Sequence, residues 1–189
     1  MTRHCVLIAA AVLSVACNRT PAASGSQPEA GYSPEPHSNL AQMMRGIPFT
    51  FSNIIFDAQS QDPATPRVAA DTGGSAGATA TFKNVYGGWQ EVENSALALA
   101  ETANLVMIPG RLCENGKPVP IEDEAYRTAA RGLAAAGQAA YKAAQSKNLD
   151  AMVDVSDTVS MACANCHERY RDFDDPKDRC TPGGKREAP

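Results

Sequence analysis

Three residues with reactive side chains stand close together near the C-terminus, as Cys163, Cys166 and His167. On a helix, side chains three and four positions apart lie on one face, so the two thiols and the imidazole would share a side. The C-x-x-C-H spacing is typical of c-type haem attachment, in which the thiols form thioethers to two vinyl groups. A neutral imidazole is a standard ligand of haem iron. The motif therefore predicts one covalently attached haem c with His167 as an axial ligand.

Other uses of two cysteines at this spacing are less consistent with the sequence. A thiol redox pair normally opens a helix after a strand, and no strand pattern precedes Cys163. A tetrahedral zinc site needs further ligands, and the mature chain offers only His37, Cys113 and Cys180 elsewhere. A disulfide between cysteines three apart on a helix has poor geometry. Haem attachment remains the favoured interpretation.

Helices must position this motif. Apolar residues recur three and four positions apart in residues 149–170, 126–144, 92–106 and 40–58. Ser38 or Asn39 could cap the first segment, and Pro48 is expected to kink or interrupt it. The 33 alanines also favour helix, and the short connection between the last two segments makes them antiparallel neighbours. The predicted fold is all-α, an antiparallel four-helix bundle with haem near the C-terminal helix.

The C-terminal segment from Cys163 to Arg171 resembles the class II cytochromes c, which comprise cytochrome c′ and its low-spin, methionine-ligated relatives. The resemblance covers residues 38–173 and is most specific in the last helix. It implies a haem near the C-terminal end of the bundle, with Arg171 four residues beyond the proximal His167. The long insertion at 59–88, the segment 109–120 and the C-terminal tail depart from the compact family pattern.

The sixth iron ligand would come from the first helix. In an up-down-up-down bundle, the start of helix one and the end of helix four lie at the same end. Met44 lies there on the core seam of the heptad register, with Met43 one step aside as a substitute ligand. A methionine of helix one fills this role in the low-spin relatives, although methionine on an apolar face also serves packing alone. Arg45 and Arg171 are candidates for haem propionates, and Arg45 could equally be a solvated charge.

The same topology argument applies to two further cysteines. Cys113 follows the end of the second helix and Cys180 the end of the fourth, so both would lie at the haem end. In an oxidising compartment they would form either a disulfide or two unpaired thiols.

The ends of the chain indicate export. Residues 1–16 resemble a signal peptide of the lipoprotein type, which would leave Cys17 as the lipid-bearing residue. Residues 17–37 would be a flexible tether, 38–175 the cytochrome domain with its long loop 59–88, and 176–189 a tail without fixed structure beyond Cys180. The expected location is the periplasm or cell envelope of a Gram-negative bacterium, with a lipid anchor.

These observations predict a monohaem electron carrier and not an enzyme. His4 lies in the signal and His37 in the tether, so only His167 remains, and no acid–base constellation is apparent. The alternatives are a five-coordinate protein of the cytochrome c′ type that binds NO or CO, and an assembly lipoprotein stabilised by its haem. Redox proteins are the expected partners, and Cys17 would tether the protein to the membrane. The sequence leaves both a monomer and a homodimer open. With 21 acidic against 17 basic residues, no nucleic-acid footprint is present.

Overall fold

The computed structural model describes residues 33–65 and 85–183. The chain divides into a unit of Met1–Ser33 and a unit of Pro34–Pro189, and the account below concerns the second. The predicted signal peptide, the lipidation site Cys17 and most of the tether lie outside the described residues, as does much of the predicted loop 59–88.

The first helical segment is interrupted where proline requires it. Helix α1 spans Leu40–Gly46 and α2 spans Pro48–Asp57, with Ile47 between them. Asn39 caps α1 in a capping box with Gln42, each side chain accepting the other residue's backbone N–H. Pro48 occupies the first position of α2, where its missing N–H breaks no intrahelical bond. The sequence therefore sets both the start of α1 and the break after it.

Three longer helices follow, and their ends are set by local side chains. Helix α4 spans Trp89–Leu105, α5 spans Glu124–Ser146 and α6 spans Leu149–Tyr170. Asp123 and Asn148 accept backbone N–H groups at the starts of α5 and α6. Because α5 and α6 are joined only by Lys147 and Asn148, with Lys147 left-handed at φ 53°, they run in opposite directions.

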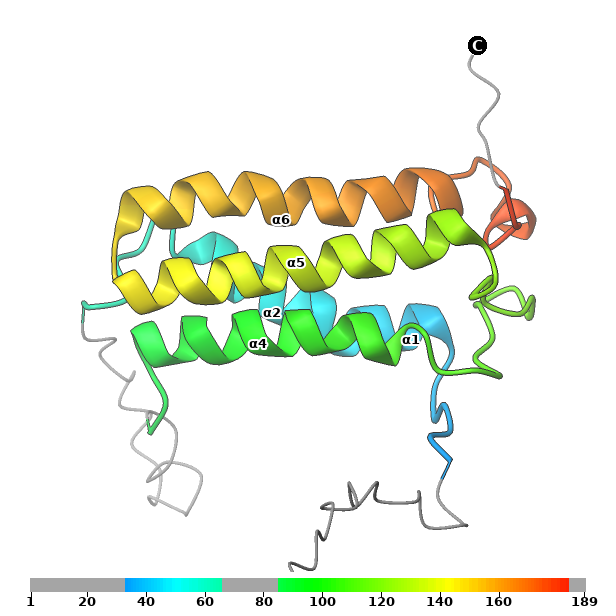
Figure 1. Ribbon diagram of the computed structural model, residues 1–189, viewed down its shortest axis with the longest axis horizontal. Helices are drawn as coiled ribbons and strands as arrows, with labels where there is room; N and C mark the ends of the chain where they lie inside the picture. Colours follow the sequence, from blue (N-terminus) through cyan, green and yellow to red (C-terminus); the bar gives the residue numbers. More distant parts are fainter. Residues whose placement is uncertain (1–32, 66–84, 184–189) are drawn as a thin grey trace, which may run out of the picture. The chain divides into compact units, whose positions relative to one another are not determined.

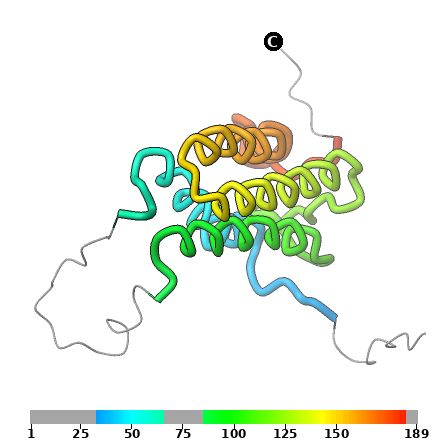
Figure 2. The backbone as a smooth tube through the Cα atoms, turned by 60° about the vertical axis from the view of Figure 1, so that its left-hand side comes forward, coloured from blue at the N-terminus to red at the C-terminus, as the bar shows by residue number. Residues whose placement is uncertain are grey.

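The helices pack side by side, with α5 between α4 and α6 (Figures 1 and 2). Helix α2 contacts both α4 and α6, so its apolar side is covered from two directions. One buried cluster lies along the middle of the helices, with Ile55, Leu99, Met152 and Val159 fully enclosed. Within the described residues the structure is helical and lacks named strands, which confirms the all-α prediction.

One end of the domain gathers α1, the end of α4, the start of α5 and the end of α6 (Figure 1). A second buried cluster lies there and includes Met43, Val106, Tyr126 and Tyr170. The connection from α4 to α5 is held by an isolated bridge between Leu112 and Pro118 and by backbone bonds. The motif of α6 therefore faces the segment predicted to hold its partner ligand.

The C-terminal tail is more ordered than the sequence indicated. After α6, a 3₁₀ turn at Pro176–Asp178 leads to Cys180, whose N–H donates to Tyr170. Beyond it, Thr181 accepts from Lys117, and the N–H of Gly183 donates to Asp123 at 2.7 Å. The expectation of no fixed structure beyond Cys180 was wrong as far as Gly183, because polar groups of the α4–α5 connection supply bonds that composition does not reveal. No helix in the described part is long and apolar enough to cross a bilayer.

Candidate functional site

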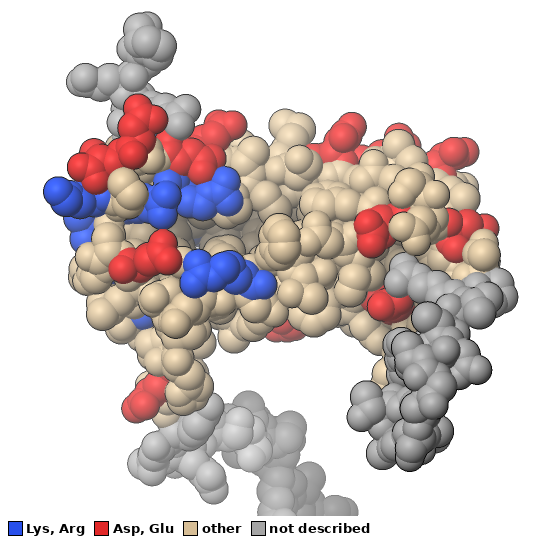
Figure 3. Space-filling model, turned by 180° about the vertical axis from the view of Figure 1, so that it is seen from behind, with Lys and Arg blue, Asp and Glu red and all other residues tan. Residues whose placement is uncertain are grey.

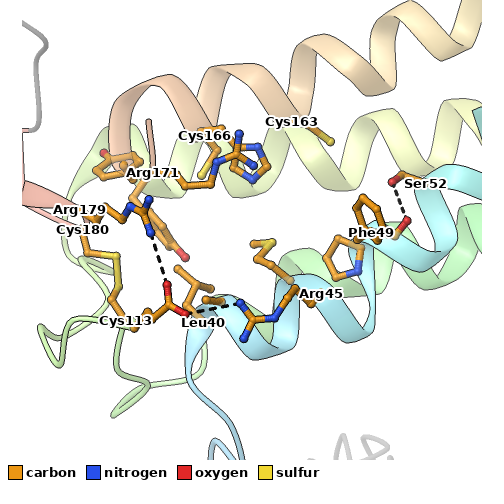
Figure 4. Close-up of a pocket in the computed structure, with 17 residues that line it drawn as sticks. Leu40, Arg45, Phe49, Ser52, Cys113, Cys163, Cys166, Arg171, Arg179 and Cys180 are labelled. Carbon is orange, nitrogen blue, oxygen red and sulfur yellow. Dashed lines mark hydrogen bonds and ion pairs between the residues drawn. A yellow bond between two sulfur atoms is a disulfide. The ribbon is translucent and has the colours of Figure 1, made fainter. Parts of the chain in front are cut away.

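Helix α6 brings the motif to one cavity. Cys163, Cys166 and His167 lie in its last two turns, and all three are half-buried. Their side chains line a cavity of about 280 Å³ at the end of the domain described above (Figure 4). A smaller cavity of about 40 Å³ shares these three residues and extends toward Leu133 of α5. The helical spacing predicted for the motif is therefore realised with all three groups on one wall.

The facing wall comes from the broken first helix. Leu40, Met44 and Arg45 of α1 line the cavity together with Pro48 and Phe49 of α2. The side chain of Phe49 lines this largely apolar cavity and is nevertheless 66% exposed, which is unusual for a phenyl ring. The remaining lining residues come from α1 and α2, from the α4–α5 connection, from α5, from the end of α6 and from the tail: Ala41, Ser52, Cys113, Glu114, Tyr126, Tyr170, Arg171, Arg179 and Cys180.

The two methionines have different surroundings. Met44 is half-buried and lines both cavities, each of which also includes His167. Met43 is 6% exposed, packs in the core cluster with Val106 and Tyr126, and lines neither cavity. The predicted heptad register places Met44 on the core seam and Met43 beside it, whereas the structure buries Met43 and leaves Met44 half-buried. The reason is that α1 ends after Gly46, so a register extrapolated through Pro48 does not apply to it.

Basic side chains surround the mouth of the cavity. Figure 3 shows Lys and Arg gathered around a hollow at one end of the domain, with Asp and Glu beside them, while the other end of that face shows Asp and Glu alone. Arg45, Arg171 and Arg179 line the cavity, and Glu114 is the sole carboxylate among its lining residues. Glu114 forms an ion pair with Arg45 at 3.5 Å and accepts a hydrogen bond from Arg179 at 3.4 Å, so it joins α1 to the tail (Figure 4).

Arg171 has a partner of its own, because its Nε donates to Asp172 at 2.6 Å. All these pairs are partly exposed and contribute little stability, about 0–1 kcal/mol each. Their guanidinium groups could exchange such a partner for another carboxylate at the mouth. Arg45 and Arg171, the sequence candidates for propionates, are thus both at the cavity, and Arg179 joins them.

Burial keeps the motif uncharged. Burial raises the pKa of Cys163, which Arg171 opposes, and raises the pKa of Cys166 to about 11, with Cys163 adding to the rise. Burial also lowers the pKa of His167; Arg171 lowers it further and Asp172 opposes this. The imidazole is therefore neutral at pH 7, the form in which its nitrogen lone pair is available to a metal.

Two tyrosines form the inner boundary of the site, and the sequence did not single them out. Tyr126 and Tyr170 meet edge to face, with ring centroids 5.2 Å apart. The hydroxyl of Tyr170 donates to Asp123 at 3.0 Å, and that of Tyr126 to the carbonyl of Val106 at 3.4 Å. Burial, with that hydrogen bond second, raises the pKa of Tyr170 to about 12. Both tyrosines lie on the predicted helical stripes, which is the signal that could have found them.

The structure joins Cys113 and Cys180 in a disulfide, one of the two alternatives the sequence left open. The bond links the α4–α5 connection to the tail at the edge of the cavity (Figure 4). It thereby fixes the neighbouring Glu114 and Arg179, which follow or precede the two cysteines directly. The sequence could place both cysteines at this end but could not measure their separation.

The arrangement fits a covalently held haem by its own chemistry. Two thiols and a neutral imidazole share one wall, a thioether lies among the apolar residues of the cavity, and guanidinium groups border the mouth. In the described ranges, no three His, Cys, Asp or Glu side chains are grouped so as to hold a bare metal ion. Comparison with protein-family models, curated proteins and solved structures found no match for this chain.

Proposed function

We propose that this protein is a c-type monohaem cytochrome that transfers single electrons in the cell envelope. The observation that carries the proposal is one cavity lined both by the complete attachment motif of α6 and by Met44 of α1. Neither element alone would suffice, because the motif indicates attachment and the thioether indicates an iron ligand suited to electron transfer. When bound, haem would supply a one-electron couple at its iron.

Each residue has a definite role in this proposal. Cys163 and Cys166 hold the cofactor covalently, which keeps it bound in a cavity that is open at its mouth. His167 and Met44 would hold the haem iron through a nitrogen and a sulfur atom, and the thioether sulfur would favour the reduced state. Arg45 and Arg171 would pair with propionate carboxylates, and Arg45 would then exchange its ion pair with Glu114 for one with a propionate.

The finer fold proposal is an antiparallel four-helix bundle of the class II cytochrome c type, in which α1 and α2 together form the first helix. It is supported by the contacts of α2 and α5 with both α4 and α6. The location proposed is the periplasmic side of a Gram-negative envelope, with a lipid anchor at Cys17 and other redox proteins as partners.

The test is the optical spectrum of protein purified from a host with working cytochrome c maturation. We expect haem that stays with the denatured chain, a low-spin spectrum and a methionine–iron charge-transfer band. Met44→Ala should lose that band, whereas Met43→Ala should keep it and lose stability by about 2–5 kcal/mol from the core. The neighbouring methionine is thus a matched control for truncation.

Two results would contradict the proposal in different ways. Haem-free protein from such a host would exclude a cytochrome altogether. A high-spin, five-coordinate spectrum with ready CO binding in the unmodified protein would instead favour the cytochrome c′-like binding of NO or CO.

A further inference from the structure

Arg111 is a buried charge at the same end of the domain as the cavity. It is 5% exposed and lies in the connection that follows α4. One guanidinium nitrogen donates to the carbonyl of Ser38 at 2.7 Å and to its hydroxyl at 3.4 Å, and the other to the carbonyl of Leu105 at 3.1 Å. All three acceptors are neutral oxygens.

No carboxylate balances this charge within the described residues. Arg111 has no ion pair there, and its Nε is buried without a hydrogen-bond partner. Leu105 belongs to the last turn of α4, whose carbonyl end carries roughly half a negative charge. Because a guanidinium stays protonated in proteins, the carbonyls offset only part of its charge, and a net positive field remains.

Arg111 lies behind the cavity wall and does not line the cavity itself. Leu40, two residues after its acceptor Ser38, and Cys113, two residues after Arg111, both line the cavity, and Leu40 is bonded to the same connection at Leu112. Tyr126 also lines it, and its hydroxyl donates to the carbonyl of Val106, which follows the Leu105 carbonyl that Arg111 binds. Burial is the main cause that raises the pKa of Tyr126, Cys166 adds to the rise, and the charge of Arg111 opposes it. Arg111 is therefore held next to residues of the cavity wall without lining the cavity.

We propose that Arg111 raises the reduction potential of the haem held by Cys163, Cys166 and His167. The proposal rests on the proposed function and concerns a residue that touches no part of the cofactor. Oxidation of the iron adds a positive charge, which a fixed neighbouring cation opposes across a poorly screening interior. The arginines at the mouth differ, because Arg45, Arg171 and Arg179 are paired with carboxylates and exposed to salt.

Two substitutions separate charge from structure. Arg111→Lys keeps the positive charge but loses the planar fork that joins Ser38 to Leu105, whereas Arg111→Gln also loses the charge. Both should lower stability to urea. Only Arg111→Gln should lower the reduced-to-oxidised ratio at a fixed ambient potential, by threefold or more, which is about 28 mV for a one-electron couple at about 59 mV per tenfold. Equal ratios in the two variants would leave Arg111 a purely structural residue and overturn the proposal.

A second pair keeps the test decisive if the Arg111 variants do not fold. Ser38 already contacts the guanidinium and is half-exposed, so Ser38→Asp places a carboxylate beside Arg111 and Ser38→Asn is its neutral control of equal size. We expect the Asp variant to show the lower reduced fraction and the Asn variant to match the unmodified protein. Identical fractions would show that this position is not coupled to the iron and would overturn the proposal.

The outcomes also distinguish the role of Arg111 from the proposed electron-transfer function on which it rests. Covalent haem with ratios insensitive to both pairs would overturn the role of Arg111 and leave electron transfer intact. Protein without haem would overturn the proposed function and the role of Arg111 with it.

Discussion

The contact between α4 and α5 depends on one glycine. A Cβ added at Gly137 would lie 2.5 Å from the backbone nitrogen of Ala100, 2.8 Å from its Cα and 2.9 Å from its Cβ. Ordinary contacts between such atoms are about 3.5–4.0 Å, so the overlap is about 1 Å and most of it is with backbone. A side chain can rotate away from a clash, but backbone can yield only if the two helices separate. Gly137→Ala should therefore disturb the packing along both helices.

Gly132 on the same helix provides a matched control. It is exposed, and a Cβ added there would meet nothing within 4 Å. Both substitutions gain about 1 kcal/mol of helix propensity, but only Gly137→Ala opposes this with overpacking of about 3 kcal/mol, the upper end for a clash with backbone. We expect Gly132→Ala to stabilise the protein by about 1 kcal/mol and Gly137→Ala to destabilise it by about 2 kcal/mol.

The assay is urea unfolding of the full chain, followed by far-ultraviolet circular dichroism, with thermal unfolding as a second measure. A loss of about 2 kcal/mol corresponds to a fall in Tm of about 4–8 °C for a chain of this size. If Gly137→Ala were as stable as Gly132→Ala, α4 and α5 would not meet at Ala100, and the described packing would be refuted.

Two further predictions concern the tail. Replacing both Cys113 and Cys180 by alanine opens a loop that spans 67 residues and should lower the free energy of unfolding by about 4 kcal/mol through chain entropy. The measurement is urea unfolding of the variant against the oxidised unmodified protein, and a loss under about 1 kcal/mol would argue that the tail is not cross-linked. The pKa of Asp123 lies below its ordinary 3.8, chiefly because Gly183 and then Ala125 donate backbone N–H groups to its carboxylate. The charged carboxylate therefore stabilises the fold above pH 3.8, and this stabilisation is lost as the pH falls through the lower pKa of the folded state. The stability difference between the unmodified protein and Asp123→Asn should therefore be constant from pH 5 to 7 and shrink below pH 4, and a difference that stayed constant to pH 2 would show that the charge has no role.

Local signals in the sequence were sufficient for the helices. The apolar stripe that begins at Leu149 and ends at Tyr170 coincides with α6, and the proline at 48 coincides with the start of α2. Such features depend on side-chain period, on capping oxygens and on the missing N–H of proline, all of which act within a few residues. The attachment motif is equally local, since its three groups lie within two turns.

Only the tertiary structure decided what faces the motif. Whether Met43 or Met44 meets the cavity depends on the orientation of α1, which the break at Ile47 separates from α2 and which its neighbours in the fold determine. The partner of Cys113, the role of Glu114 between two arginines and the burial of Arg111 all depend on segments more than 60 residues apart in sequence. Sequence determined which side chains a helix presents to one side; the packing of distant segments determined which of them share a cavity, because contact and burial arise between elements and not within them.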